Sequence, residues 1–294
     1  MCIRDSACST DGNGRWCELD PREGTKRVVA EAFRNVASVG ARPLATTNCL
    51  NFGNPERPEI MWQFAESVAG LGEACEALGV PVTGGNVSLY NETRVGDTSQ
   101  HIWPTPVVGI LGLLEHATDA VGLAFRAPDD VVFLIGSDTR PGLAGSALQQ
   151  HLDLPLGGRL APVDLQMEAN LGEVLHEAAR EGLLHSAHDV GHGGLVATLA
   201  ESALAGGLGV TIQPEEGVDP RQVLFSESPG RVVVTVPSAN VRAFAQLCAD
   251  VDVPLRDIGT VGGDAIDLAD VVRLDLEDVR RANSGALAAV LEQG

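Results

Sequence analysis

The feature that most limits the fold is an alternation of helical and strand-like segments over the N-terminal third of the chain. Apolar residues recur at three- and four-residue intervals in residues 23–40 and again in residues 58–78, which predicts two amphipathic helices. Gly40 and Gly79 end these stretches, and Pro58 stands where the second helix begins. Short apolar runs that predict strands lie between and after the helices, at residues 44–47, 80–83 and 107–114. A chain with this order is typical of an α/β domain.

A second alternation begins after residues 115–128, where the apolar pattern breaks up. We therefore place a boundary there and predict an N-terminal domain over residues 7–118 and a C-terminal domain over residues 119–294. In the second domain, strands are predicted at residues 131–136, 210–213, 231–236 and 255–261. Helices are predicted at residues 164–181, after the Gly193–Gly194 pair, at residues 238–250 and at the end of the chain.

The charge of the chain excludes a large class of functions. The 40 acidic and 20 basic side chains give a net charge of −20, and such a surface repels the phosphates of nucleic acids and of anionic membranes. We therefore expect neither a nucleic-acid partner nor a membrane partner. An anionic substrate would have to be held by metal ions or by local Arg and Lys residues. The 34 glycines and the 44% hydrophobic content are typical of a soluble protein with many turns.

The six cysteines are scattered without C-x-x-C spacing, which favours a reducing cytoplasm over a disulfide scaffold or a zinc ribbon. No apolar run reaches the roughly 18 residues of a membrane span, and the first residues lack the apolar core of a signal peptide. We therefore predict a cytoplasmic location. Residues 1–6 look unrelated to the rest of the chain, so we expect an artefact at the start of a truncated chain.

Two polar, glycine-containing segments, Asn48–Pro55 and Thr83–Glu92, are candidates for a ligand site. Each follows a predicted strand, which places both at strand ends facing helices, where α/β proteins generally bind ligands. Glycines let the backbone approach a ligand closely, and Asn and Ser side chains can orient a sugar, a phosphate or a hydrated metal. An ordinary turn is the alternative for either segment alone. The occurrence of two such segments favours the ligand site.

A succession of motifs resembles one enzyme family. In chain order the motifs are Asp11–Trp16, Leu19–Gly24, Ala30–Asn35, Gly40–Pro43, Asn48–Pro55, Gly84–Glu92, Pro104–Gly109, Ala187–Val190 and Leu224–Ser228. This succession resembles the C-terminal half of the large (synthetase) subunit of phosphoribosylformylglycinamidine synthase, and the resemblance runs from about Ala7 to the end of the chain.

The resemblance implies the fold of the aminoimidazole-ribonucleotide-synthetase superfamily. In that fold an N-terminal α/β domain pairs into a barrel and is followed by a larger α+β domain with a mixed sheet. The family subunit contains two such halves in tandem, and this chain resembles the second of them. The first strand of the N-terminal domain is expected to be missing, which would leave an open sheet edge and uncovered apolar barrel surface. We therefore expect the chain to self-associate.

The reaction that the resemblance implies is the ATP-dependent conversion of formylglycinamide ribonucleotide to formylglycinamidine ribonucleotide, with ammonia taken from glutamine, in purine biosynthesis. It implies Mg²⁺ and ATP, and as partners a glutaminase subunit, a small bridging subunit and the missing N-terminal half. The catalytic histidines of the family lie in that first half. No catalytic residue is therefore expected here, and the chain alone is expected to be inactive.

The resemblance also implies roles for four residues of the two polar segments. Asn48 and Gly85 match positions that contact ATP, Asn86 matches a Mg²⁺ ligand, and Ser88 matches a substrate contact. Asn48 departs from the family pattern, in which Asp is usual, and an amide brings no charge to a nucleotide site. One neutral oxygen from Asn86 cannot hold Mg²⁺ alone.

The segment His185–His192 has three histidines, a density that suggests a metal site. Its glycines favour instead a loop that leads into a helix, and the resemblance gives Asp189 another role. Asp189 matches an acidic residue of an auxiliary site, which in some relatives holds Mg²⁺ and a structural ADP. Family members often have an acidic residue at the position of His192, so this site is expected to be weak or empty. Ser226–Ser228 is expected to brace a loop.

Two alternatives remain open at this stage. The chain could be a non-catalytic nucleotide-binding or scaffolding half onto which the glutaminase docks. It could also be another enzyme of the superfamily, such as aminoimidazole ribonucleotide synthetase or selenophosphate synthetase. The latter needs a reactive Cys near a glycine-rich N-terminus, which the sequence lacks. Cys49 has no supporting His-Asp arrangement, so a small buried side chain is favoured over a nucleophile.

Overall fold

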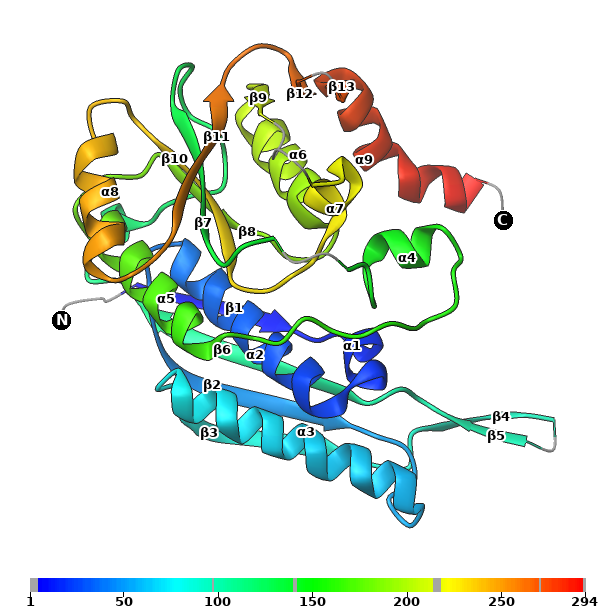
Figure 1. The fold of residues 1–294 in the computed structure, drawn as a ribbon. Coiled ribbons are helices and arrows are strands. Elements are labelled where there is room, and N and C mark those ends of the chain that lie inside the picture. Colours follow the sequence, from blue (N-terminus) through cyan, green and yellow to red (C-terminus); the bar gives the residue numbers. More distant parts are fainter. Residues whose placement is uncertain (1–4, 97, 140–141, 214–217, 270, 293–294) are drawn as a thin grey trace.

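Four strands form a sheet in the N-terminal part of the chain (Figure 1), in the order β1 (Ser6–Asp11), β6 (Thr105–Leu113), β2 (Arg42–Asn51) and β3 (Val82–Ser88). The computed structural model describes residues 5–96, 98–139, 142–213, 218–269 and 271–292. Strand β6 is antiparallel to β1 and to β2, whereas β2 and β3 are parallel. A parallel pair needs a crossover connection, and α3 (Pro58–Ala77) supplies it between β2 and β3.

Two helices cover one face of this sheet, as their apolar stripes predict. Helix α2 (Pro21–Ser38) begins at the N-cap Asp20, whose carboxylate accepts hydrogen bonds from the next two free backbone N–H groups, and Pro21 stands at its first position. Helix α3 packs beside α2, and the Cys75 thiol on α3 lies 3.7 Å from the buried Thr46 hydroxyl on β2. Both predicted helices are confirmed within two residues at each end.

The opposite face of the sheet is not covered by any helix of the described residues. Side chains alternate across a strand, so Ala45, Thr47 and Cys49 project from this face, and Leu111 of β6 projects there with 46% of its surface exposed. Strands β1 and β3 form the two edges of the sheet. Whether a further strand precedes β1 in the complete protein stays a prediction.

Seven strands form the second sheet, and α5 and α8 pack on one of its faces while α6, α7 and α9 pack on the other. Its order is β13 (Val272–Asp275), β12 (Ala265–Leu268), β9 (Val210–Ile212), β11 (Leu255–Val261), β7 (Val131–Gly136), β10 (Arg231–Val236) and β8 (Ser186–Asp189). All pairs are antiparallel except β9 with β12, so the sheet is mixed, as predicted. The helices are α5 (Leu165–Arg180), α6 (Gly194–Gly206), α7 (Pro220–Phe225), α8 (Val241–Asp250) and α9 (Leu276–Glu292).

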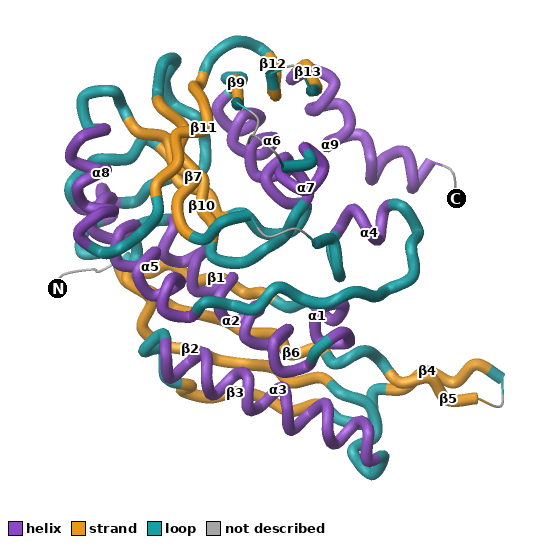
Figure 2. Tube along the Cα trace, viewed as in Figure 1, coloured by secondary structure: helices purple, strands orange, loops and turns teal. Residues whose placement is uncertain are grey.

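Helices α2 and α5 lie between the two sheets and join the two parts of the molecule (Figure 2). They approach closely at Gly172, where an added Cβ would lie 2.6 Å from the ring of Phe33. Strand β8 also packs against α2. As a result, residues on one face of α2 lie beside the end of β8, although more than 150 positions separate them in the chain.

The predicted strands are all present, but two of them are longer than the apolar runs suggested. Strand β2 continues to Asn51 and β3 continues to Ser88, so the first halves of both polar segments are strand and not turn. The prediction that these segments lie after the strands is wrong for residues 48–51 and 83–88. A polar residue on an edge or open strand carries no apolar signal, although its backbone pairs like any other.

Several elements have no counterpart among the sequence-based predictions. They are α1 (Gly14–Leu19), the hairpin of β4 (Glu92–Val95) and β5 (Thr98–His101), the short helix η1 (Ala117–Asp119), α4 (Ala147–His151), β8, α7, β12 and β13. The β4–β5 hairpin projects away from the rest of the molecule (Figure 1). No helix of the described chain is both long enough and apolar enough to cross a membrane.

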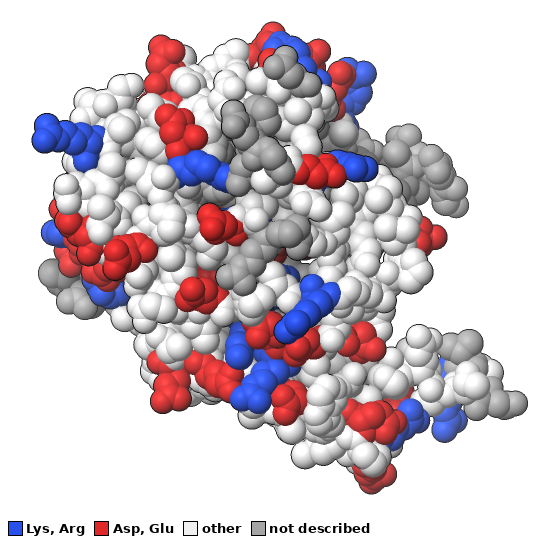
Figure 3. Space-filling model, in the orientation of Figure 1, with Lys and Arg blue, Asp and Glu red and all other residues white. Residues whose placement is uncertain are grey.

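The surface carries acidic and basic side chains side by side, with acidic ones in excess (Figure 3). On the outer side of α2 and α3, Glu73 forms ion pairs with Arg22 and Lys26, the second at 2.7 Å between Nζ and Oε2. Exposed pairs of this kind contribute little to stability, typically below about 1 kcal/mol each. The buried ion pairs lie instead between the two sheets.

Candidate functional site

The two predicted nucleotide contacts, Asn48 and Gly85, stand opposite each other in the parallel register of β2 and β3. A Cβ on Gly85 would lie 2.6 Å from Asn48 Oδ1. The lack of a side chain at position 85 therefore lets the Asn48 amide lie against the β3 backbone. The sequence places a glycine where the neighbouring strand needs room for an amide.

The other two predicted residues, Asn86 and Ser88, project from the open face of the same strand. Asn86 pairs with Cys49 in the register, and its Nδ2 lies 3.6 Å from the Cys49 sulfur. Ser88 pairs with Asn51, and its hydroxyl lies 3.3 Å from Asn91 Oδ1. Cys49 lies between two amides and is half-buried, whereas the sequence predicted a buried side chain, because it projects from the open face of the sheet.

The structure thus brings all four predicted residues onto neighbouring strands, but on two faces of the sheet. Asn48 and Gly85 belong to one face, and Asn86 and Ser88 belong to the other. A ligand that contacts all four would have to lie across the C-terminal edge of the parallel pair. Most of β3 is exposed, so this edge is a single open wall.

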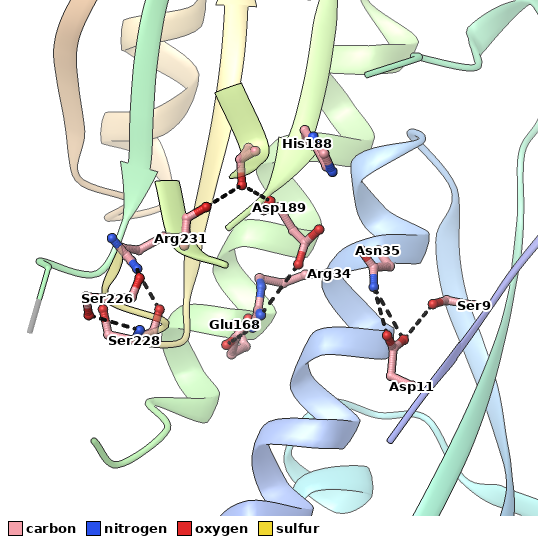
Figure 4. A network of polar contacts seen from close by, with 12 residues as sticks. Ser9, Asp11, Arg34, Asn35, Glu168, His188, Asp189, Ser226, Ser228 and Arg231 are labelled. Carbon is pink, nitrogen blue, oxygen red and sulfur yellow. Dashed lines mark hydrogen bonds and ion pairs between the residues drawn. The ribbon is translucent and has the colours of Figure 1, made fainter. Parts of the chain in front are cut away.

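Asp189, the fifth predicted residue, ends strand β8 at the junction of the two sheets (Figure 4). Its Oδ2 lies 3.8 Å from Nη2 of Arg34 on α2, and Nη1 of Arg34 lies 2.5 Å from Glu168 Oε1 on α5. All three side chains are buried. One arginine therefore faces two buried carboxylates that come from different elements.

Two further acidic residues and one amide lie beside Asp189. Asn35 Nδ2 donates to both carboxylate oxygens of Asp11, at 3.2 and 3.3 Å (Figure 4). Glu31, one helical turn before Asn35, faces the same space: a Cβ on Gly191 would lie 2.5 Å from Glu31 Oε1 and 3.0 Å from Asp189 Oδ2. We call Asp11, Glu31, Asn35 and Asp189 the seam cluster.

The seam cluster carries more negative charge than its surroundings compensate. Burial, followed by the nearby Asp189 carboxylate, raises the pKa of Glu31 to about 8. Burial also raises the pKa of Asp189, against the opposing effect of Arg34, and Asp189 Oδ2 has no hydrogen-bond partner. Carboxylate and amide oxygens that are buried and unpaired are the ligands that Mg²⁺ prefers.

The residues of the seam cluster fit a divalent cation, although they do not form a preassembled cage. Among the described residues, no three His, Cys, Asp or Glu side chains stand in a geometry ready for a metal ion. A hollow of about 380 Å³ opens beside the cluster and is lined by Asp11, Gly12, Asn13, Gly14, Arg15, Glu31 and His192. A cation held here would have room for water and for an anionic ligand.

The signals for the seam cluster were present in the sequence but were not recognised. Glu31 and Asn35 are four residues apart on a predicted helix, so they share a face, and Asp11 ends a segment that pairs beside that helix. Asp11, Glu31 and Asn35 all lie in motifs that carry the family resemblance. What the sequence could not show is that the α2 face points at the end of β8.

The three histidines of the segment His185–His192 have separate partners. His185 Nδ1 lies 2.7 Å from Asp130, His188 Nε2 lies 3.2 Å from Glu201, and the exposed His192 lies 3.8 Å from Glu227. The glycines form the predicted loop into α6, but Ser186–Asp189 of the segment form strand β8, which the sequence did not predict.

The prediction that Ser226–Ser228 braces a loop is confirmed by its central residue. Oε1 of the buried Glu227 accepts hydrogen bonds from the backbone N–H groups of Ala147 and Gly193, both at 2.8 Å. Those two groups begin α4 and precede α6, respectively. Glu227 therefore fixes two helix starts to the turn after α7.

Two family models match the chain. The model described as AIR synthase related protein, N-terminal domain, matches residues 3–114, and AIR synthase related protein, C-terminal domain, matches residues 127–270. Between them they account for most of the chain.

Among curated proteins, the phosphoribosylformylglycinamidine synthase subunit PurL of Thermobifida fusca is 49% identical over 291 residues, which cover 98% of this chain. The protein of the same description from Streptomyces coelicolor is 46% identical over 285 residues, which cover 97% of this chain. The chain spans 37% of the length of these relatives.

Solved structures share the fold. Thermotoga maritima PurL complexed with FGAR has a TM-score of 0.76 and 19% identity, covering 94% of this chain and 46% of that one. The same protein complexed with ATP has a TM-score of 0.73 and 20% identity, covering 94% and 44%. At these identities the likeness establishes the arrangement of the two sheets and their helices.

Proposed function

The chain belongs to the AIR synthase related proteins, and from this membership we propose that it is the second half of the large subunit of a phosphoribosylformylglycinamidine synthase. The identity of 46–49% to such subunits over nearly the whole chain supports the proposal. The complete subunit would be an ATP-dependent ligase that converts formylglycinamide ribonucleotide and ammonia to formylglycinamidine ribonucleotide. Glutamine would supply the ammonia through a glutaminase partner, with a small bridging subunit in the assembly. The domain boundary near residue 118 is part of the same proposal.

The observation that carries the proposal is the open wall formed by β2 and β3. Asn86 offers an amide oxygen, Ser88 offers a hydroxyl, and Gly85 leaves room for the Asn48 amide, on a strand that pairs with one neighbour among the described residues. Such a wall can position a ligand but cannot surround it or exclude water. In the complete subunit, the first half would close the site from the other side.

When bound, Mg²⁺ would shield and align the triphosphate of ATP for phosphoryl transfer to the amide oxygen of the substrate. The residues of this chain would orient the participants: the Asn48 amide, for which Gly85 leaves room, can hydrogen-bond the nucleotide, and Ser88 can hydrogen-bond a substrate oxygen. Asn86 can add one oxygen to a cation that other residues hold. A general acid or base is not among these groups, so these residues would position the participants and not transfer protons.

The experiment joins this chain to the preceding segment of the Streptomyces coelicolor relative and measures ATP-dependent formation of the amidine with ammonium as donor. We expect no product from the 294-residue chain alone and turnover from the joined protein. A soluble, folded joined protein that forms no product would contradict the proposal.

The seam cluster supports a second function, that of an auxiliary Mg²⁺-nucleotide site contained in this half. Asp11, Glu31, Asn35 and Asp189 all belong to this chain, and the adjacent hollow has Arg15 on its wall. Isothermal titration of the chain with ADP tests it: saturable binding in Mg²⁺ that EDTA abolishes supports the site. Equal heats with and without Mg²⁺ would contradict it.

Exposed apolar side chains of the first sheet also support the expected self-association. Leu111 of β6 projects from the open face and is 46% exposed, and Leu44, Val82 and Val87 on the other face of β2 and β3 are each more than 40% exposed. Light scattering of the chain at increasing concentration should show a rising mean mass, and a constant monomer mass would contradict the proposal.

A further inference from the structure

A cavity of about 530 Å³ lies apart from both the β2–β3 wall and the seam cluster, between helix α2 and two loops of the second domain. Its walls are Arg27, Gly142, Ala144, Ser146, Arg159, Leu160, Ala161, Pro162, Ser226, Glu227 and Ser228. No residue of the β2–β3 wall or of the seam cluster is among them. The volume is within the range of small-molecule sites, and half of the walls are apolar.

Arg27 is the unusual group of this cavity, because it is a buried cation that forms no direct ion pair among the described residues, although the nearby carboxylates of Glu227 and Glu23 favour its charged form. Its side chain lies over the ring of Trp16, with the guanidinium carbon 5.1 Å from the ring centre, and the residue is only 4% exposed. Nε donates to the Ala161 carbonyl at 3.2 Å. Within the described part of the chain, Arg27 forms no ion pair and its Nη groups have no hydrogen-bond partner.

A buried arginine normally meets a carboxylate, as Arg34 does with Glu168 two turns later on the same helix. Burial lowers the pKa of Arg27 to about 10, so the group is still charged at neutral pH. Arg27 lines the cavity. An anion that enters the cavity would make the direct contact with the guanidinium group that no carboxylate of the described residues makes.

Two further charged residues of the cavity, Arg159 and Glu227, determine which chemical groups a bound anion must carry. Arg159 is exposed at the cavity and has no ion pair among the described residues, so it adds a second cation. Glu227 lines the cavity as well, and its buried Oε2 has no hydrogen-bond partner. A free phosphate would meet this carboxylate unfavourably, whereas a ligand that also carries hydroxyl donors could satisfy it.

We propose that this cavity binds a phosphorylated sugar, with the phosphate held by Arg27 and Arg159 and a sugar hydroxyl donating to Glu227. Planar guanidinium groups pair well with phosphate oxygens, and Trp16 fixes the plane of Arg27. Leu160, Ala161 and Pro162 supply the apolar wall for the ring carbons. Because none of the cavity walls belongs to the β2–β3 wall, this binding does not depend on the proposed ligase activity.

The test is a titration of the 294-residue chain with D-ribose 5-phosphate, followed by calorimetry and by tryptophan fluorescence. Trp16 is buried beneath Arg27, whereas Trp62 and Trp103 are exposed, so a fluorescence change should disappear in Trp16→Phe. We expect saturable binding that weakens at least tenfold in Arg159→Ala. Arg126→Ala, a change at another exposed arginine of the same domain that does not line the cavity, is the control and should bind as the parent does.

Arg27→Gln tests the role of the buried cation. If Arg27→Gln does not fold, Arg159→Ala still tests the proposal, because Arg159 is exposed. Uncharged D-ribose and inorganic phosphate, titrated in parallel, should each bind at least tenfold more weakly than the sugar phosphate. The proposal is overturned if a folded chain does not bind ribose 5-phosphate up to about 10 mM. It is also overturned if Arg159→Ala binds as tightly as the parent, or if inorganic phosphate binds as tightly as the ester.

Discussion

The β2–β3 wall and the seam cluster show two opposite ways in which one chain presents polar groups to a ligand. On the wall, Asn86 and Ser88 are neutral and lie on an exposed strand with one neighbour. In the cluster and in the Arg34–Glu168 pair beside it, charged groups from α2, α5 and β8 are buried together. Removing a side chain from the wall should leave the fold intact, whereas changing a charge in the cluster should alter its stability.

The difference follows from solvation. An exposed amide exchanges water for a ligand at little cost, so the wall needs no compensating partner within the chain. Buried carboxylates lose their hydration and must be paired, protonated or bound to a cation. The wall is therefore incomplete without a second surface, and the cluster is incomplete without a counter-charge.

The largest difference in stability between the two regions is expected when Arg34, beside the cluster, is replaced. Replacing it by Met leaves Glu168 and Asp189 buried without their cation, and breaking a buried pair in this way typically costs about 3–5 kcal/mol. Urea denaturation should show this loss for Arg34→Met and a change below about 0.5 kcal/mol for Asn86→Ala.

The matched control for Arg34 is Arg42→Met, because Arg42 also faces two carboxylates but is half exposed. Its cost should stay below about 1 kcal/mol. Equal losses at both arginines would show that burial of the Arg34 group is not what makes it important.

The next effect is a dependence of the free energy of unfolding on pH, which Glu31 introduces. Its pKa is raised from 4.5 to about 8 in the folded chain, so between pH 4.5 and 8 the folded state holds a proton that the unfolded state has released. The free energy of unfolding contributed by this group therefore falls as the pH rises through that window. Glu31→Gln should match the parent near pH 4.5 and exceed it by about 3–5 kcal/mol at about pH 8.5, without Mg²⁺.

The measurement is denaturant unfolding of both proteins in EDTA from about pH 4.5 to about pH 8.5. Asn86→Ala should follow the parent across the whole range, because it changes no titrating group. A constant difference between Glu31→Gln and the parent would mean that the Glu31 carboxyl is not perturbed by its surroundings.

Added Mg²⁺ should restore part of the free energy of unfolding that is lost when Glu31 ionises. A ligand at about one hundred times its dissociation constant stabilises by about 2.7 kcal/mol, and Mg²⁺ can bind the cluster only when its carboxylates are ionised. We expect the stabilisation by Mg²⁺ to be larger at about pH 8.5 than at about pH 6. Thermal unfolding should show it for the parent and for Asn86→Ala but not for Asp189→Asn.

The smallest effect separates two neighbouring glycines of the wall. A Cβ at Gly85 meets the Asn48 amide, whereas a Cβ at Gly84 meets nothing within 4 Å. Gly85→Ala should cost at most about 1 kcal/mol, since the Asn48 side chain can turn away, and Gly84→Ala should cost nothing. If the two variants unfold alike, Asn48 does not lie against β3.

The sequence predicted the two domains' elements because the buried strands and helices have strong apolar periods. Helix α2 and strands β7 and β10 were predicted closely, since each is nearly fully buried on at least one face. Residues 48–51 and 83–88 were misjudged because open and edge strands keep polar side chains. The β4–β5 hairpin is exposed and has no apolar pattern at all.

The sequence also indicated Asn48, Gly85, Asn86, Ser88 and Asp189 as site residues, and the structure separates them into two regions. Their assigned roles stay predictions. Glu31, Asn35 and the cation Arg27 were missed because their importance depends on which way α2 faces. Only the packing of α2 against α5 and β8 brings that face to the end of a strand from the other domain.

The most direct measurement is turnover of the joined protein with one substitution in each region. Asn86→Ala should reduce ATP-dependent amidine formation at least tenfold while leaving the unfolding temperature unchanged, because the wall takes part in the reaction. Glu31→Gln, assayed well below its unfolding temperature, should retain most of the turnover. Loss of turnover in Glu31→Gln together with full activity in Asn86→Ala would contradict the assignment of the reaction to the β2–β3 wall.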